Sequence, residues 1–364
     1  MAIKVLVVDD TIFYRKVLQD LLSSLPDVEV VGTANNGKVA LSRLKALKPD
    51  LLTLDVEMPE MNGLEVLQEI QRHGYDVECL MVSSLTQKGG EITVQALSLG
   101  ALDFIAKPDA ESADENVALL KKAIEPKLRA FHRRRELKNL VKGRPGPAKP
   151  TVSEKDVKDF DTVISKTKSA ESRTEKSRAI ALGVSTGGPN ALNKVIPKLS
   201  AGLQVPVFVV QHMPKTFTAS LAQVLNKQSA LEVKEAQNGE VVRPNVVYIA
   251  PGGMQMKVAS GASGQRIIRV NDDPPENNCK PSVDYLFRSV AREYGSKATA
   301  VIMTGMGADG KLGVKVMKSA GAVSIAQNAA TCVVYGMPKA VIDAGLADVV
   351  APVESIAQEI QKTV

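Results

Sequence analysis

The first third of the chain alternates short apolar runs with amphipathic segments. Each run is rich in β-branched residues or leucine and is bounded by turn residues, which is typical of a buried strand. The five runs are Ile3–Val8, Val28–Gly32, Leu51–Leu54, Cys79–Val82 and Asp103–Ala106. The segments between them carry apolar residues at helical spacing, and the last helix is expected from about Ala113 to Leu137. This alternation predicts a five-stranded parallel sheet covered by helices on both faces.

A second α/β pattern begins at Arg178 and continues to the C-terminus. It opens with AIALGVSTGG, which predicts a strand running into a glycine-rich turn. Further strands are predicted at Val205–Val210, Ala298–Met303 and Ala322–Ala326. Helices are predicted near Phe217–Asn226, Ser282–Tyr294 and Lys311–Ala320. Together with a β-rich stretch at Leu231–Val270, these segments predict a doubly wound α/β domain with a β-rich insertion.

The stretch between the two patterns has a different composition. From Lys138 to Ser177 it is rich in Pro, Gly, Ser, Thr and charged residues, with few large apolar side chains. Such a segment cannot bury enough apolar surface to offset the entropy of ordering, so it is expected to be a flexible linker. We therefore predict a first domain at 1–132, a linker at 133–177 and a second domain at 178–364.

Composition narrows the class of protein. The 364 residues exceed one typical domain, and 44% hydrophobic and 24% charged residues are ordinary for a globular chain. The sequence has no apolar stretch near the roughly 18 residues of a membrane span, and its N-terminus lacks the features of a signal peptide. The spacing of Cys79, Cys279 and Cys332 indicates neither a disulfide framework nor a zinc site. We expect a cytoplasmic protein without membrane insertion.

A basic run, Lys127–Lys149, contributes much of the formal net charge of +6. Such a run can bind nucleic acid or an acidic partner surface. A solvated helix end leading into a linker is the favoured interpretation. Because helix-turn-helix and zinc-finger patterns are missing from the sequence and aromatic residues are few, no nucleic-acid partner is expected.

Polar residues follow four strands of the first predicted sheet. Asp9 and Asp10 close the first strand, Asp55 the third and Ser83 the fourth, and Lys107 follows the fifth. The carboxyl ends of parallel strands meet at one edge, so these side chains are expected in one crevice. Three converging carboxylates favour a hard cation such as Mg²⁺, beside which an aspartate can attack a phosphoryl group. The alternative is that they are ordinary strand-end residues that cap helices.

The segments VLVVDD, LTLDVEMPEMNGLEVL, MVSSLT and DFIAKP resemble those of response-regulator receiver domains, which have a flavodoxin-like sheet. The resemblance implies that Asp55 accepts phosphate from a histidine kinase. It also implies that Ser83 and Lys107 contact the phosphoryl group and that Phe104 is the aromatic switch residue.

The same resemblance implies how Mg²⁺ binds for phosphorylation. Asp10, Asp55 and the backbone carbonyl of Glu57 would ligate the ion, with Asp9 assisting.

The second domain carries candidate residues for nucleophilic catalysis. Gly183–Gly187 matches G-x-S-x-G directly after a predicted strand, and its glycines permit a sharp turn that exposes Ser185. A phosphate-binding loop or a plain tight turn would give the same local pattern. A serine nucleophile needs a base, and among the three histidines of the sequence only His212 follows the linker. It lies at the end of the next predicted strand, where a parallel sheet would bring it to the same edge as Ser185.

The base in turn needs a carboxylate to orient it. Asp309 follows an apolar strand within VIMTGMGADG, which places it at the same edge, although a helix N-cap is an alternative role. The other acidic residues available on composition are Asp272, Asp273, Asp284, Asp343 and Asp348.

The segments ALGVSTGGP, VQHMP, APGG and MTGMGADG resemble the catalytic domain of chemotaxis protein-glutamate methylesterases, from Arg178 to the C-terminus. The order of receiver, linker and esterase is also that of the family. The resemblance implies that Ser185 attacks, that His212 acts as general base and then general acid, and that Asp309 fixes the tautomer of His212. Backbone N–H groups near Thr186 and Met306 would bind the oxyanion, and the esterase would need no cofactor.

The expected reaction is hydrolysis of glutamate γ-methyl esters on chemoreceptors, with deamidation of receptor glutamines at the same site. The resemblance further implies that the unphosphorylated receiver blocks this site and that phosphorylation of Asp55 relieves the block. A response regulator whose second domain only binds a partner or nucleic acid is the alternative. A lipase-type esterase is disfavoured, because its acid lies between serine and histidine in the chain.

Overall fold

The computed structural model describes residues 2–109, 112–142 and 175–364, which form two compact units that divide at Arg134–Arg135. Most of the predicted linker, 143–174, lies outside the described residues. Within the described residues, the helices are all too short or too polar to span a bilayer.

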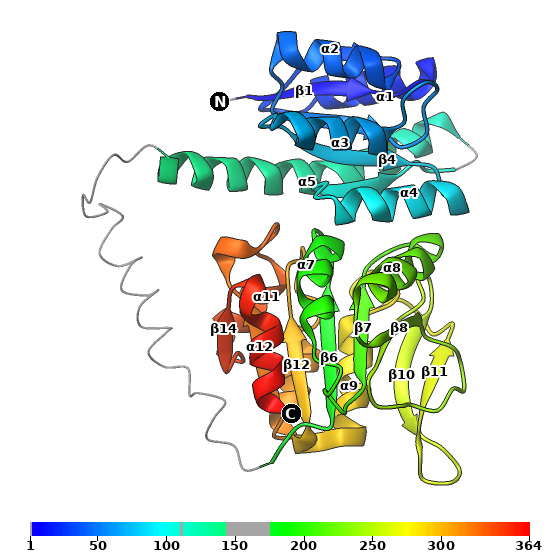
Figure 1. The fold of residues 1–364 in the computed structure, drawn as a ribbon, viewed down its shortest axis with the longest axis vertical. Helices are drawn as coiled ribbons and strands as arrows, with labels where there is room; N and C mark the ends of the chain where they lie inside the picture. The colour runs from blue at the N-terminus through cyan, green and yellow to red at the C-terminus, as the bar shows by residue number, and fades with distance from the viewer. Residues whose placement is uncertain (1, 110–111, 143–174) are drawn as a thin grey trace. The chain divides into compact units, whose positions relative to one another are not determined.

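The first unit contains a five-stranded sheet in the order β2-β1-β3-β4-β5, with all neighbouring strands parallel (Figure 1). The predicted flavodoxin-like fold is therefore confirmed. Every residue of the central strand β3 is buried, so helices must cover both faces of the sheet. The strands are β1 (Ile3–Val8), β2 (Val28–Ala34), β3 (Leu51–Asp55), β4 (Glu78–Ser83) and β5 (Asp103–Ala106).

The helices of this unit begin at local signals in the sequence. In α3, Asn62 and Glu65 form a capping box, and Gly74 ends the helix with a left-handed conformation. The helices are α1 (Ile12–Ser23), α2 (Gly37–Leu47), α3 (Gly63–His73), α4 (Gln87–Ser98) and α5 (Ala113–Lys142). Helix α5 continues past the predicted end at Leu137 and into the predicted linker, because the Lys, Arg, Glu and Leu residues there are good helix formers.

The second unit is built on a seven-stranded parallel sheet in the order β14-β13-β12-β6-β7-β9-β8. Its strands are β6 (Ala179–Val184), β7 (Val207–Gln211), β8 (Glu232–Glu235), β9 (Val246–Ile249), β12 (Ala298–Ile302), β13 (Val323–Gln327) and β14 (Val349–Ala351). The chain starts in the middle at β6, adds β7 on one side and later adds β12 on the other. The carboxyl end of β6 is therefore a topological switch point, where ligands bind in open α/β sheets.

The predicted β-rich insertion is divided between two sheets. Strands β8 and β9 extend the main sheet, whereas β10 (Gln255–Ser260) and β11 (Arg266–Asn271) form a separate antiparallel hairpin. All four residues of β9 are buried, as expected for a strand covered on both faces.

Helices pack on the main sheet of the second unit (Figure 1). Helix α9 contributes Val283, Leu286 and Phe287 to a core that also contains Ala181 of β6 and Ala300 of β12. The helices are α7 (Gly188–Val195), α8 (Lys215–Gln228), α9 (Val283–Tyr294), α10 (Lys311–Ser319), α11 (Met337–Asp343) and α12 (Val353–Thr363).

Candidate functional site

Ser185 and His212 are neighbours at the switch point of the second sheet. Val184 and Gln211, the last residues of β6 and β7, are paired in register, so Ser185 and His212 follow adjacent strand ends. Paired strands lie about 4.8 Å apart. The amide of His212 donates to the carbonyl of Val184 at 3.2 Å, which continues the pairing to the histidine. The structure thus brings the predicted nucleophile and base together, although no hydrogen bond joins their side chains in the described part of the chain.

A sharp turn carries Ser185 between β6 and α7. The N–H of Gly188 donates to the carbonyl of Ser185 at 2.7 Å, and Gly187 adopts a φ of 73° that favours glycine. A Cβ at Gly187 would lie 2.5 Å from the side chain of Val333, so the close packing also requires glycine. The sequence motif therefore has the turn that was predicted from it.

The loop after β12 packs directly against Ser185. The amide of Ser185 donates to the carbonyl of Thr304 at 2.9 Å, and a Cβ at Gly305 would lie 2.8 Å from the Cβ of Ser185. This loop follows β12, which pairs with β6 on the opposite side from β7, the strand that precedes His212. The hydroxyl of Thr304 donates to the carbonyl of Thr186 at 2.9 Å, which ties the two loops together.

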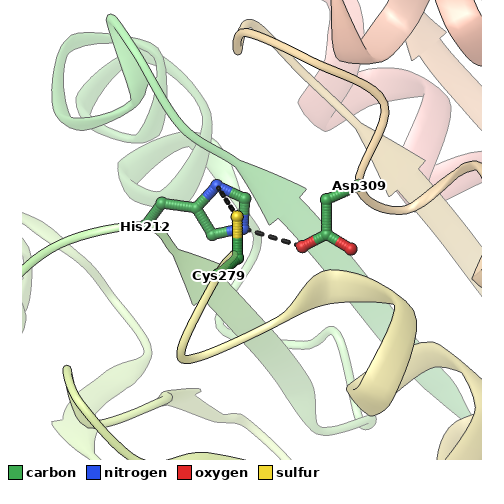
Figure 2. Close-up of side chains that lie close together, drawn as sticks. All are labelled: His212, Cys279 and Asp309. Carbon is green, nitrogen blue, oxygen red and sulfur yellow. Dashed lines mark hydrogen bonds and ion pairs between the residues drawn. The ribbon is translucent and has the colours of Figure 1, made fainter. Parts of the chain in front are cut away.

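Asp309 orients His212. Nε2 of His212 donates to Oδ2 of Asp309 at 2.9 Å, and Figure 2 shows the carboxylate on one side of the ring. Asp309 is 3% exposed, and its oxygens also accept backbone N–H groups of Val283 at 2.8 Å and Asp284 at 3.1 Å. The N-terminus of α9 thus holds the carboxylate in place, and the ring nitrogen left for proton transfer is Nδ1.

Burial and hydrogen bonds shift the pKa values of both residues of the pair. Burial disfavours the imidazolium, but the bonds to Asp309 and Cys279 outweigh it and raise the pKa of His212 to about 9. Burial also disfavours the carboxylate of Asp309, but hydrogen bonds from His212 and from Val283 and Asp284 lower its pKa to about 2. Asp309 is therefore ionised at neutral pH and stabilises the imidazolium that forms when His212 accepts a proton.

Three residues in contact with this pair were not assigned to the site by the sequence reasoning: Asn277, Cys279 and Ser282. Asn277 donates to Asp309 at 3.1 Å and to Asp284 at 3.0 Å, and the hydroxyl of Ser282 donates to Asp309 at 3.0 Å. The thiol of Cys279 lies 3.7 Å from Nδ1 of His212 (Figure 2). The side chains of this loop reach Asp309 and His212 only through the tertiary fold, so spacing along the chain gave no signal for them.

Gln211 links the two strand ends behind the site. Its side chain is 2% exposed, and Nε2 donates to the carbonyl of Ser185 at 3.0 Å and to that of His212 at 3.2 Å. A Cβ at Gly188 would lie 1.8 Å from Oε1 of Gln211, so the glycine makes room for this side chain. Gln211 therefore fixes the spacing between Ser185 and His212.

The first unit brings its own predicted cluster together at the carboxyl ends of β1, β3 and β5. Nζ of Lys107 lies 2.7 Å from Oδ2 of Asp55 and 2.8 Å from Oδ2 of Asp9. Burial raises the pKa of Asp55 to about 7, against the lowering effect of Lys107. Tyr14, which the sequence reasoning missed, places its ring 4.7 Å from Nζ of Lys107 and donates its hydroxyl to the carbonyl of Pro108 at 3.0 Å.

The remaining predicted residues of this cluster lie around it. Ser83 is buried at the end of β4, and its carbonyl accepts the amide of Lys107 at 2.7 Å. Phe104 is a buried residue of β5. The amide of Glu57 donates to Oδ1 of Asp55 at 3.4 Å, and the side chain of Glu57 accepts from the hydroxyl of Ser84 at 2.6 Å.

The carboxylates of the first unit fit a hard divalent cation. Ligand atoms of Asp9, Asp10 and Asp55 all lie within 4.8 Å of one another. Asp9 and Asp55 are buried, so their charges need compensation, and oxygen-only donor sets with several carboxylates suit Mg²⁺. The donor set is thus compatible with the predicted ion.

Two family models match the chain. The model described as CheB methylesterase matches residues 180–360, and the model described as response regulator receiver domain matches residues 5–117. The first match contains Ser185, His212 and Asp309, and the second contains Asp55 and Lys107.

The similarity to curated relatives extends over both units. A protein-glutamate methylesterase/protein-glutamine glutaminase of Desulfotalea psychrophila is 47% identical over 370 residues, which cover 100% of this chain and 98% of the relative. A Bacillus subtilis protein of the same name is 45% identical, with 100% and 98% covered. The crystal structure of the Thermotoga maritima CheB methylesterase catalytic domain matches with a TM-score of 0.51 and 42% identity, over 52% of this chain and 100% of that chain.

Proposed function

We propose, since this chain belongs to the protein-glutamate methylesterase/protein-glutamine glutaminase family, that it hydrolyses γ-methyl esters of chemoreceptor glutamates in the cytoplasm. Deamidation of receptor glutamines would use the same site, because ester and amide hydrolysis share a tetrahedral intermediate. The observation that carries the proposal is the His212–Asp309 pair, held beside Ser185 at the switch point of the sheet.

Ser185 is the nucleophile in this proposal. Because Nε2–H of His212 is held by Asp309, Nδ1 accepts the hydroxyl proton as Ser185 attacks the ester carbonyl. The imidazolium then returns the proton to the departing methoxide, and methanol leaves an acyl-enzyme. Water, deprotonated by the same nitrogen, hydrolyses the acyl-enzyme and restores Ser185.

The developing oxyanion requires donors on the other side of the serine. The amides of Thr186 and Met306 are the proposed donors, because Thr186 follows the nucleophile and Met306 follows Gly305, which packs against Ser185. Loss of one such donor typically lowers the rate by about 10²–10³-fold.

The proposed control of this activity lies in the first unit. A chemotaxis histidine kinase would transfer a phosphoryl group to Asp55, with Ser83 and Lys107 binding its oxygens and Phe104 as the switch residue. Asp10, Asp55 and the carbonyl of Glu57 would hold Mg²⁺, with Asp9 assisting. The ion, when bound, neutralises charge on the phosphoryl oxygens.

Methanol release from methylated receptor membranes tests the proposal, measured with and without acetyl phosphate and Mg²⁺. We expect phosphodonor-stimulated release from the unaltered chain and a loss on the order of 10⁴-fold or more for Ser185→Ala, with folding intact. Normal release by Ser185→Ala would exclude this nucleophile. No release from the unaltered chain under either condition would favour a second domain that only binds a partner.

Cys279 needs a separate test as nucleophile, because its sulfur lies 3.7 Å from the base nitrogen. A Cys–His–Asp arrangement would reverse the outcome of the two substitutions, with Cys279→Ala inactive and Ser185→Ala active. We expect the opposite, since Ser185 has the strand-to-helix turn and the adjoining amides that an acyl transfer requires.

A further inference from the structure

Cys279 and His212 bring two metal-binding atoms, Sγ and Nδ1, close together. Their separation, 3.7 Å between Sγ and Nδ1, is longer than a strong hydrogen bond. It matches the about 3.6 Å expected when a zinc–sulfur bond of about 2.3 Å and a zinc–nitrogen bond of about 2.1 Å meet at a tetrahedral angle. Both side chains are partly exposed, so an ion can reach them.

A rigid turn holds the thiol in this position. Glu276 and Cys279 exchange two backbone hydrogen bonds, of 2.8 and 3.1 Å, around Asn277 and Asn278. Both asparagines have left-handed backbones, with φ of 53° and 59°, as the tight primed turns require. The side-chain amide of Asn277 donates hydrogen bonds to Asp309 and Asp284, and Arg288 forms an ion pair with Glu276. The turn therefore fixes the position of the sulfur, which lies 3.4 Å from the carbonyl of Asn277 and 3.7 Å from Nδ1 of His212.

The other ligand is oriented from behind. Asp309 accepts Nε2–H of His212 and thereby leaves Nδ1 with its lone pair, and Figure 2 shows the sulfur of Cys279 in front of the ring, with a dashed line to Nδ1. A carboxylate on the far nitrogen of a metal-binding histidine is the usual outer partner of protein zinc sites. Oδ2 of Asp309 already accepts from Val283 as well as His212, so Asp309 supports the site without ligating the ion.

We propose that Cys279 and His212 form a binding site for a thiophilic divalent cation of the Zn²⁺ class, and that the bound ion inhibits the esterase. Binding displaces the thiol proton, and any proton on Nδ1, to solvent as the metal–sulfur and metal–nitrogen bonds form. Water completes the tetrahedron. Inhibition follows because the ion occupies the nitrogen that must accept the proton of Ser185, and this second half of the inference rests on the proposed function.

The ligand chemistry separates this site from that of the first unit. Sulfur and imidazole select Zn²⁺ and Co²⁺ over Mg²⁺ and Ca²⁺, which prefer oxygen ligands such as those of Asp9, Asp10 and Asp55. Millimolar Mg²⁺ is therefore expected to leave the Cys279–His212 site free.

Cobalt binding to the reduced full-length chain tests the site without reference to catalysis. Co²⁺ bound to a thiolate absorbs in the near ultraviolet, whereas Co²⁺ bound to carboxylates alone does not. We expect this band to appear on titration, to be displaced by Zn²⁺ and to be lost in Cys279→Ala. Cys332→Ala is the matched control, because Cys332 is a buried thiol whose sulfur lies 4.0 Å from the carbonyl of Gln327. Absence of the band, or its persistence in Cys279→Ala, would overturn the proposal.

The effect of the bound ion on activity is measured as the ratio of the Zn²⁺ inhibition midpoints of a variant and the unaltered chain. Esterase rates with and without Zn²⁺, in the absence of phosphodonor, give an inhibition midpoint for each variant. We expect this midpoint to rise by at least about tenfold in Cys279→Ala and to stay unchanged in Cys332→Ala. If the chain has no esterase activity, the proposed function fails, but the cobalt band still shows whether the metal site exists. If Zn²⁺ displaces Co²⁺ from the site but leaves the esterase rate unchanged, the inhibitory role is refuted.

Discussion

The hydrogen bonds of His212 determine how the proposed base titrates. A general base acts in its neutral form, so raising its pKa to about 9 moves the acid limb of the rate profile upward from the ordinary value near 6.5. We expect kcat/KM of the unphosphorylated chain, in chelator-treated buffer, to rise with pH until about 9. At pH 7 only about one hundredth of His212 would be neutral. An acid limb near 6.5 in the unaltered chain would contradict the assigned role of Asp309.

The substitution Asp309→Asn tests the same hydrogen bond from the other partner. It removes the charge that stabilises the imidazolium and favours the wrong tautomer, so we expect the maximal rate to fall by about 10⁴-fold. We also expect the acid limb to move down toward 6.5, because the carboxylate that raises the pKa of His212 is gone. The pH dependence of the rate is the decisive measurement. A purely structural defect would lower the rate without changing the pH of the acid limb.

Gln211 is expected to position Ser185 and His212 without contacting substrate. In Gln211→Glu, a buried carboxylate would face the two carbonyls that now accept from Nε2. We expect kcat to fall by about 10²-fold through misplacement of the two catalytic side chains, with KM little changed. The control is Gln361→Glu, because the side chain of Gln361 accepts a hydrogen bond from the amide of Ser200, and glutamate can do the same. Equal effects of the two substitutions would argue against a positioning role.

At the level of elements, the site depends on how closely β6 and the loop after β12 approach. A Cβ at Gly305 would lie 2.3 Å from Sδ of Met337 and 2.8 Å from Cβ of Ser185. We expect Gly305→Ala to cost about 1–3 kcal/mol of unfolding free energy and to displace the serine, with loss of methanol release. Gly202→Ala is the matched control, since its nearest neighbour would be Oγ of Ser200 at 3.6 Å. Denaturant unfolding and activity assays compare the two.

Elements with a strong local signal could be predicted from the sequence, and those defined by tertiary pairing could not. The predicted strand Ile3–Val8 has the same bounds as β1, because a buried parallel strand is a nearly continuous apolar run. The strand-end positions of Ser185, His212 and Asp309 followed from the same pattern. The pairing of β8 and β9 with the main sheet, and the approach of Asn277 and Cys279 to Asp309 and His212, depend on contacts between distant segments that no periodicity encodes.

At the level of the whole molecule, the chain combines a receiver domain with a methylesterase domain, which carry the proposed phosphoacceptor and the proposed hydrolytic site. Coupling between the two sites requires a conformational equilibrium whose position both sites can shift. The family relationship of both units supports such coupling. The proposed direction is that the unphosphorylated first unit blocks the esterase and that phosphorylation relieves the block.

Asp55→Ala separates this control from the chemistry. The substitution removes the carboxylate that accepts phosphate but leaves Ser185, His212 and Asp309 unaltered, so basal methanol release should persist. Stimulation by acetyl phosphate and Mg²⁺ should disappear, because the population of the active state can no longer be shifted. The control is Asp20→Ala, which removes an exposed carboxylate of α1 and should respond as the unaltered chain does. Normal stimulation of Asp55→Ala would place the phosphorylation site elsewhere, and loss of its basal activity would mean that Asp55 supports the esterase directly rather than through phosphorylation.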